Sequence, residues 1–311
     1  MRRGCNDGAV TELPAGVHAM AARGGQWPAW VDALPTIAQR HIEDWGLTRD
    51  GPAMRGSHSM VLPVRTTAGT AAVLKISFPE PRSEHEHLAL RRWDGDGAVR
   101  LLSANPRSRV LLLERAHPDD LATLPDVQAC QVVAQLYRRI HVPALPKLPT
   151  LASFVERRTG ELGALPRNAP LPRRLVEQAI ALGTDLVADP VSTGSVGGIG
   201  IVVHGDLHYA KVLAAQREPW LVIGPQPLNG DPHYELAPML WNRWGELDDV
   251  RDGIRRRFHT LVETAGLAES RARAWVIVRA VHSAMRELTT CGNPDRARLT
   301  AYVAVAKAVQ D

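Results

Sequence analysis

Residues 201–234 read IVVHGDLHYAKVLAAQREPWLVIGPQPLNGDPHY, and the organisation of the whole chain can be worked out from this segment. A short apolar run, residues 201–203, leads into a polar segment at 204–211. Two further apolar runs follow at 212–214 and 221–223, separated by a polar turn. Short apolar runs between polar turns are typical of buried strands. The segment therefore predicts a strand, a loop rich in titratable side chains, and a β-hairpin.

Sequence patterns on either side of this segment divide the chain of 311 residues into a sheet-rich part and a helical part. Before His117 the patterns predict helices at 27–45 and 79–93, and strands at 60–65, 70–77, 99–103 and 109–114. After it, the hydrophobic periodicity predicts helices at 124–141, 171–188, 234–246, 249–265, 270–288 and 294–309. Strands first and helices later favour an α+β fold.

Three parts are expected along the chain: an N-terminal lead-in at 1–25, an N-lobe at 26–117, and a helical C-lobe at 118–311 that carries the polar loop. The lead-in shows no periodicity. Residues 191–200 read VSTGSVGGIG. They are expected to form a flexible loop and no phosphate-binding turn, because they lead into a strand and do not open a helix.

Composition narrows the class of protein. The net charge is only +4, and the arginines are scattered among acidic residues, so nucleic-acid binding is not expected. Three cysteines far apart in the sequence fit a reduced cytosol and show no metal-ligand spacing, so no metal site is expected from them. No signal peptide and no run long enough to span a membrane is found. A cytoplasmic protein with a small-molecule partner is the expectation.

The polar loop has the spacing of a kinase catalytic loop, H-x-D-x-x-x-x-N, except at its last position. The segments VHGDLHYA, LVIGPQPLNGDP and YELAPMLWNRW, together with AVLKIS and VLLLER upstream, resemble the streptomycin 6-kinase family of aminoglycoside phosphotransferases, also called aminoglycoside/hydroxyurea resistance kinases. The resemblance runs from about residue 30 to the end of the chain. It implies a two-lobed protein-kinase-like fold with nucleotide in the cleft between the lobes.

The resemblance also implies roles for individual residues. Lys75 matches the strand lysine that holds the α- and β-phosphates, with Glu86 as its helix partner and Glu84 as a second choice. Arg115 and its neighbours match the hinge against which adenine stacks. Asp206 matches the aspartate that accepts the substrate hydroxyl proton, and His204 matches the histidine of the same loop.

Three positions depart from the family pattern, which has Asn, Asp and Lys where this chain has Lys211, Gly224 and Gln226. Magnesium prefers oxygen ligands in octahedral geometry. A lysine supplies a positive charge and no oxygen, and a glycine supplies no side chain. Both side-chain ligands of the metal are thus expected to be missing, and no cofactor is expected unless ATP and magnesium are used in an unusual way.

Three hypotheses remain open at the level of sequence. The first is a repurposed small-molecule enzyme of antibiotic or secondary metabolism, which catalyses a rearrangement, cyclisation or elimination with Asp206 as base and Lys211 stabilising negative charge. The second is an ATP-dependent streptomycin or aminocyclitol 6-phosphotransferase, and the third is a non-catalytic pseudokinase that binds a ligand. Candidate substrate-binding residues share polar or aromatic character near the loop: His208, Asp231, Glu235, Trp241 and Asn242.

Overall fold

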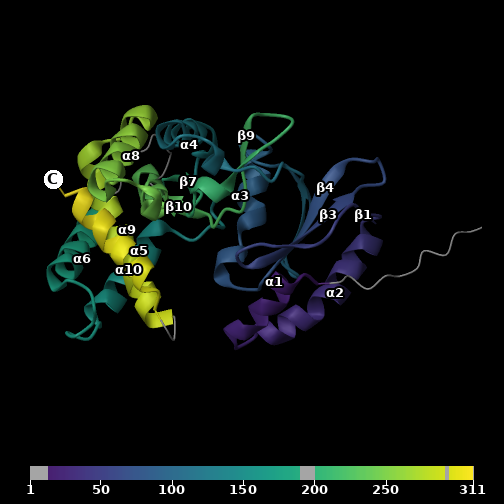
Figure 1. Ribbon diagram of the computed structural model, residues 1–311, viewed down its shortest axis with the longest axis horizontal. Helices are drawn as coiled ribbons and strands as arrows, with labels where there is room; N and C mark the ends of the chain where they lie inside the picture. The colour runs from purple at the N-terminus through teal and green to yellow at the C-terminus, as the bar shows by residue number, and fades with distance from the viewer. Residues whose placement is uncertain (1–12, 190–199, 291–293, 311) are drawn as a thin grey trace, which may run out of the picture. The chain divides into compact units, whose positions relative to one another are not determined.

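The structure is a computed structural model that describes residues 13–189, 200–290 and 294–310 (Figure 1). It separates into an N-terminal unit, Met1–Gly95 with Val99–Ala116, and a C-terminal unit, Asp96–Ala98 with His117–Asp311. The beginning of the expected lead-in, residues 1–12, and nearly all of the expected loop at 191–200 lie outside the described residues.

An antiparallel sheet forms the centre of the N-terminal unit. Its strand order is β1-β3-β4-β6-β5, and β2 also pairs with β3. The strands are β1 Thr48–Arg49, β2 Met54–Arg55, β3 Ser59–Arg65, β4 Ala71–Ser77, β5 Leu101–Asn105 and β6 Val110–Glu114. In β4, Ala72, Leu74 and Ile76 are fully buried. Because side chains alternate along a strand, Lys75 points to the opposite face of the sheet.

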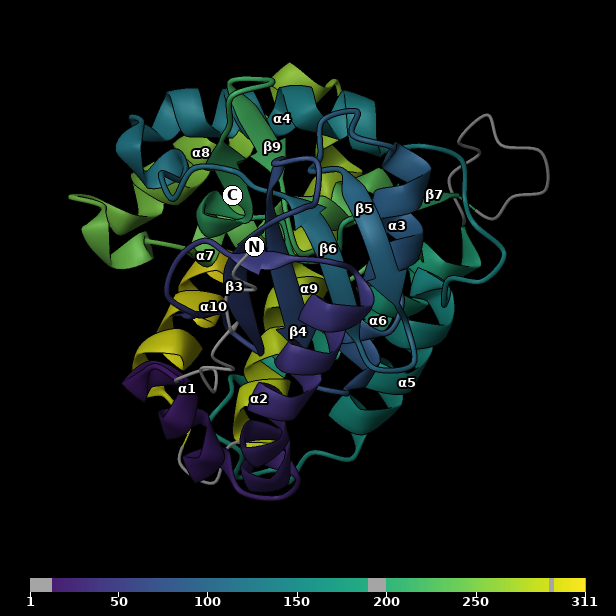
Figure 2. The ribbon, with the colours of Figure 1, turned by 90° about the vertical axis from the view of Figure 1, so that its right-hand side faces the viewer.

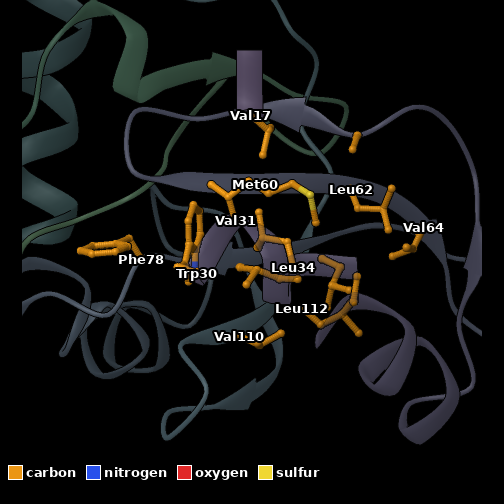
Figure 3. Packing of buried hydrophobic residues seen from close by; sticks show 14 of the residues in the cluster. Val17, Trp30, Val31, Leu34, Met60, Leu62, Val64, Phe78, Val110 and Leu112 are labelled. Carbon is orange, nitrogen blue, oxygen red and sulfur yellow. The ribbon is translucent and has the colours of Figure 1, made fainter. Parts of the chain in front are cut away.

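The helical segment before the sheet supplies the other half of the hydrophobic core. Figure 3 shows Trp30, Val31 and Leu34 of α2 (Trp27–Asp44) beside Met60 and Leu62 of β3. These helix residues recur at the spacing that places side chains on one face. Two short helices precede α2, namely α1 (Ala15–His18) and η1 (Ala19–Arg23).

Part of the segment 13–21 packs into this core. Val17 of α1 and Met20 of η1 are buried in the same cluster as the α2 face. The absence of periodicity before residue 26 did not indicate this packing, since four- and five-residue helices are too short to show a period.

Helices dominate the C-terminal unit. They are α4 Asp126–Ile140, α5 Leu151–Gly163, α6 Arg173–Ala188, α7 Ala237–Trp241, α8 Val250–Ala265, α9 Glu269–Thr290 and α10 Arg296–Ala308. The long helix α9 packs against α5, α6 and α10, while α4 packs against α8 (Figures 1 and 2). Two small antiparallel sheets, β10–β7 and β8–β9, complete the unit. The α+β prediction, with strands first and helices later, is confirmed.

The helix expected at 234–246 is broken into three pieces: η5 Pro232–Glu235, α7 and η6 Trp244–Glu246. Pro238 lies in the first turn of α7, where a residue without an N–H is tolerated. Asn242 is extended, with ψ 133°, which ends α7, and Arg243 adopts a left-handed conformation with φ 56° before η6 begins. Over the described ranges, no helix has both the length and the apolar character needed to cross a membrane.

Candidate functional site

The polar loop is held between two strand pairs of the C-terminal unit. It follows β7 (Ile201–Val203), which pairs with β10 (Leu228–Gly230). The short helix η4 (Tyr209–Lys211) then leads into β8 (Val212–Ala214), which pairs with β9 (Trp220–Val222). The backbone N–H of Ile223 donates to Lys211 O at 2.9 Å. The N–H of Gln226 donates to His204 O at 2.8 Å. Residues 204–211 and 223–226 therefore lie side by side.

The loop turns sharply at Gly205. Its φ is +80°, and a Cβ atom there would lie 2.2 Å from the backbone oxygen of Gln226. Only glycine fits such an approach in this conformation. The residue before Asp206 is thus fixed by the backbone of the neighbouring segment.

His204 is fully buried, and both of its ring nitrogens meet backbone groups. Its Nδ1 accepts from the N–H of Asp206 at 3.1 Å, so Nε2 carries the proton and donates to Ile223 O at 3.1 Å. Burial and the Lys211 charge lower the pKa of His204 to about 3. At neutral pH the ring is uncharged and holds the shape of the loop.

Asp206 is only partly buried, and its carboxylate is oriented by a neighbouring amide. Gln226 Nε2 donates to Asp206 Oδ2 at 2.9 Å. Burial acts to raise the pKa of Asp206, but the charges of His208, Lys211 and Arg279 outweigh it and keep that pKa below its usual value. Asp206 is therefore ionised at neutral pH, as a carboxylate that receives a proton must be.

Lys211 lies beside the backbone of position 224. Its Nζ donates to Gly224 O at 3.4 Å. Gly224 has a φ of 60°, a left-handed conformation that glycine adopts without strain. Within residues 13–189, 200–290 and 294–310, no group of three or more His, Cys, Asp or Glu side chains could hold a metal ion.

Asp231 and Glu235, both expected to bind substrate, have their carboxylates turned into the interior. Asp231 accepts from His233 Nδ1 at 2.6 Å, Arg271 Nε at 2.6 Å and Trp275 Nε1 at 2.7 Å. Burial acts to raise the pKa of Asp231, but the bonds from His233 and Arg271 outweigh it and lower that pKa to about 2. Glu235 is fully buried, and its Oε1 accepts from Gly205 N at 2.8 Å.

The remaining three candidates are partly buried. Burial lowers the pKa of His208 to about 4, and its Nδ1 has no hydrogen-bond partner in the described part of the chain. Trp241 packs edge-to-face against Tyr302, with ring centroids 5.1 Å apart. The backbone oxygen of Asn242 accepts from Arg257 at 2.7 Å. Substrate binding by these residues stays a prediction.

In the N-terminal unit, Lys75 and Glu86 form an ion pair. Lys75 Nζ donates to the two carboxylate oxygens of Glu86 at 2.6 and 2.8 Å, and Glu86 opens helix α3 (Glu86–Trp93). Glu84 is more exposed and lies 3.6 Å from Arg109. The sequence preference for Glu86 over Glu84 agrees with this geometry, while a role of the pair in binding a cofactor stays a prediction.

Arg115 uses its guanidinium within the sheet. It donates to Ala72 O at 3.1 Å and to Val64 O at 2.6 Å, and it pairs with Asp50 at 2.7 Å. Its side chain thus joins β3, β4 and the segment after β1. Only the backbone near Arg115 would then contact adenine, and that contact stays a prediction.

Sequence reasoning missed two residues that touch the loop, Gln226 and Arg279. In the sequence, Gln226 stands out only as a difference from the family pattern, which has a lysine there. Arg279 is buried on α9, where it donates to Tyr234 O at 2.6 Å and to Gly205 O. An arginine flanked by the apolar residues 276–278 and 280–281 was the available signal, because a buried arginine needs partners.

Comparison with known proteins places this geometry in a family. The family model for aminoglycoside/hydroxyurea antibiotic resistance kinases matches residues 44–290. The chain is 37% identical over 292 residues to streptomycin 6-kinase of Streptomyces glaucescens, covering 90% of this chain and 92% of that protein. It is also 37% identical over 294 residues to hydroxyurea phosphotransferase of Kitasatospora aureofaciens, covering 90% and 82%.

Solved structures agree on the fold. A thermostable mutant of aminoglycoside phosphotransferase APH(4)-Ia, in ternary complex with ADP and hygromycin B, is 17% identical with a TM-score of 0.59, covering 88% of this chain and 98% of that one. A choline/ethanolamine kinase family protein from Mesorhizobium loti is 16% identical with a TM-score of 0.60, covering 85% and 89%. The kinase-like fold prediction is confirmed, and the chain belongs to the aminoglycoside/hydroxyurea antibiotic resistance kinase family.

Proposed function

We propose that this protein is an ATP-dependent phosphotransferase that acts on a hydroxyl group of a small polar molecule. The observation that carries the proposal is Asp206, an ionised and partly exposed carboxylate that Gln226 orients at 2.9 Å. Relatives named streptomycin 6-kinase and hydroxyurea phosphotransferase favour this function over a repurposed enzyme. They likewise favour ATP over the expectation that no cofactor is used.

Each unit would contribute its own part of the chemistry. In the C-terminal unit, Asp206 would accept the proton of the attacking hydroxyl, and neutral His204 would hold the Asp206 backbone. In the N-terminal unit, Lys75 would bind phosphate oxygens while Glu86 fixes the position of its ammonium. Hydrogen bonds within the protein orient both groups, the Asp206 carboxylate and the Lys75 ammonium, without any ligand.

Magnesium, when bound in a kinase, neutralises negative charge on the phosphates. The residues beside Asp206 do not fit that ion well: Lys211 offers no oxygen, and position 224 offers only a backbone carbonyl that Lys211 Nζ already contacts at 3.4 Å. Lys211 would instead supply positive charge itself. An ammonium and one phosphate charge about 4 Å apart would attract each other by about 4 kcal/mol at an effective dielectric constant of about 20.

The direct test is transfer of labelled γ-phosphate from ATP to streptomycin and, separately, to hydroxyurea, with magnesium or with EDTA. We expect transfer to a small-molecule acceptor that persists in EDTA.

Asp206→Asn should lower the rate of phosphate transfer by about a hundredfold to ten-thousandfold, because it removes the base and keeps the shape of the side chain. Asp185→Asn, at an exposed position on α6, is the matched control and should behave as the wild type.

A second candidate is favoured by the charge of Lys211, which acts on the carboxylate of Asp206. Such a pair could remove a substrate proton and stabilise the resulting anion without any nucleotide, as in a rearrangement or elimination. Calorimetric titration with ATP separates the two functions. Absence of ATP binding with and without magnesium would contradict the phosphotransferase, whereas ATP binding without transfer to any acceptor would indicate a non-catalytic binder.

A further inference from the structure

Gly205, the residue before Asp206, is held through its backbone by two buried side chains. The N–H of Gly205 donates to Glu235 Oε1 at 2.8 Å, and the Gly205 carbonyl accepts from Arg279 Nη2. Glu235 is 0% exposed and Arg279 is 5% exposed. One residue of the loop thus has both of its backbone polar groups bound by side chains from outside the loop.

Arg279 is itself held in a single position. Its Nη1 donates to Tyr234 O at 2.6 Å, and its guanidinium lies over the Tyr234 ring, 4.1 Å from the centroid. The Tyr234 carbonyl is available because the residue four positions on, Pro238, has no N–H to donate in the usual helical bond. Pro238 therefore leaves the Tyr234 carbonyl free to accept from Arg279.

We propose that Glu235 and Arg279 are positioning residues that form a buried clamp on Gly205 and thereby set the place of the Asp206 carboxylate. Neither side chain needs to touch the substrate. Arg279 also acts on Asp206 through its charge, since it is one of the cations that keep the pKa of Asp206 low. The effect of the clamp on catalysis rests on the proposed phosphotransferase, but its effect on the loop does not.

Glycine at position 205 explains why the clamp acts on backbone groups. A Cβ atom there would lie 2.2 Å from Gln226 O, so no side chain is available at this turn. Asp206 is then held at three points: the backbone of Gly205 before it, the His204 ring on its N–H, and the Gln226 amide on its Oδ2. When the clamp is lost, the His204 and Gln226 contacts remain, but the backbone before Asp206 is no longer held in place.

The test compares Glu235→Gln, Glu235→Leu and Arg279→Lys with the wild type in the full-length protein. Two measurements do not depend on turnover: hydrogen exchange of the Gly205 amide, and the pKa of Asp206 from NMR of 13C-labelled aspartate. A third is the kcat and the KM for ATP in the phosphate-transfer assay with streptomycin. Glu177→Gln, an exposed position on α6, is the control.

We expect Glu235→Leu to raise exchange at Gly205 by at least about tenfold, since the amide loses its buried acceptor. The pKa of Asp206 should rise in Arg279→Lys, because a lysine cannot reach both carbonyls with the same fork. Glu235→Gln keeps an oxygen for the Gly205 N–H and should retain most of the protection. In the transfer assay kcat should fall in Glu235→Leu with little change in KM.

Unchanged Gly205 exchange and unchanged Asp206 pKa in folded Arg279→Lys and Glu235→Leu would overturn the clamp. Should Glu235→Leu fail to fold, Arg279→Lys alone decides by the same two measurements. Absence of phosphate transfer in the wild type would contradict the proposed function, while the exchange and NMR results would still decide on the clamp.

Discussion

At the scale of single residues, Gln226 is the side chain that orients Asp206. Gln226→Ala removes the amide that donates to Asp206 Oδ2 at 2.9 Å. A hydrogen bond to a charged group contributes about 1.5–3 kcal/mol, so we expect kcat to fall by about tenfold to a hundredfold. Steady-state phosphate transfer measures this, with exposed Gln39→Ala on α2 as control. Equal kcat in Gln226→Ala and Gln39→Ala would show that Asp206 needs no such partner.

Glu235 should make the stability of the protein depend on pH. Burial raises its pKa from 4.5 to about 7, although Arg279 and the loop amides oppose the shift. The folded state therefore holds this proton more tightly than the unfolded state, so the stability that Glu235 contributes is fully present below about pH 4.5 and is lost as the pH rises to about 7. A shift of this size corresponds to about 3 kcal/mol.

Glu235→Gln removes that titration. Between pH 5 and pH 8 the free energy of unfolding of the variant, from urea denaturation, should fall by about 2.5 kcal/mol less than that of the wild type. The exposed variant Glu177→Gln should follow the wild-type profile. Parallel profiles for Glu235→Gln and the wild type would mean that Glu235 titrates at its ordinary pKa.

The dependence of the protein on metal can be tested at Lys211 and Gly224. In the double variant Lys211→Asn, Gly224→Asp, oxygen ligands replace the ammonium and the bare backbone, and we expect ATP affinity in magnesium to increase by about tenfold or more. The gain is reduced by about 1–2 kcal/mol of strain, because Asp must adopt a φ near 60° at position 224. Calorimetry with magnesium and with EDTA measures it, and exposed Lys307→Asn is the control. Wild-type ATP binding that already depends strongly on magnesium would contradict the role given to Lys211.

At the scale of elements, the turn after β7 should tolerate no side chain at position 205. Gly205→Ala combines an unfavourable φ of +80° with a 2.2 Å contact to Gln226 O, so we expect a loss of about 2–5 kcal/mol and displacement of Asp206. Gly163→Ala in α5, where a Cβ atom meets nothing within 4 Å, should be neutral or stabilising. Thermal unfolding compares the two. A Gly205→Ala protein as stable as Gly163→Ala would mean that the turn relaxes easily.

Elements with a regular spacing of apolar residues could be predicted from the sequence, whereas elements in which that spacing is interrupted could not. The face of α2 and the alternation in β4 follow directly from spacing. Helix α5 was missed because Gly160, Gly163 and neighbouring arginines dilute its apolar spacing. The Asp206 loop was predicted from its H-x-D spacing, whereas Arg279 could not be placed there, since its contact with Gly205 joins residues 74 positions apart.

At the scale of the whole molecule, each unit has a core of its own. Leu34→Ala removes a fully buried side chain from the core of the N-terminal unit and should cost about 2–5 kcal/mol there. Hydrogen exchange should accelerate in β3 and β4 and stay unchanged in α9, with Gln39→Ala as control. Equal acceleration in α9 would show that the two units unfold as one.

The ion pair between Lys75 and Glu86 bears on how activity is governed. Protein kinases are turned off by swinging the helix that carries this glutamate away from its lysine. Here Glu86 is 3% exposed at the start of α3, and both of its carboxylate oxygens accept from Lys75. The helix therefore already stands in the position that holds the lysine. For the proposed phosphotransferase we accordingly expect no activation step at α3, so that the amount of protein and the supply of its substrates would set its output.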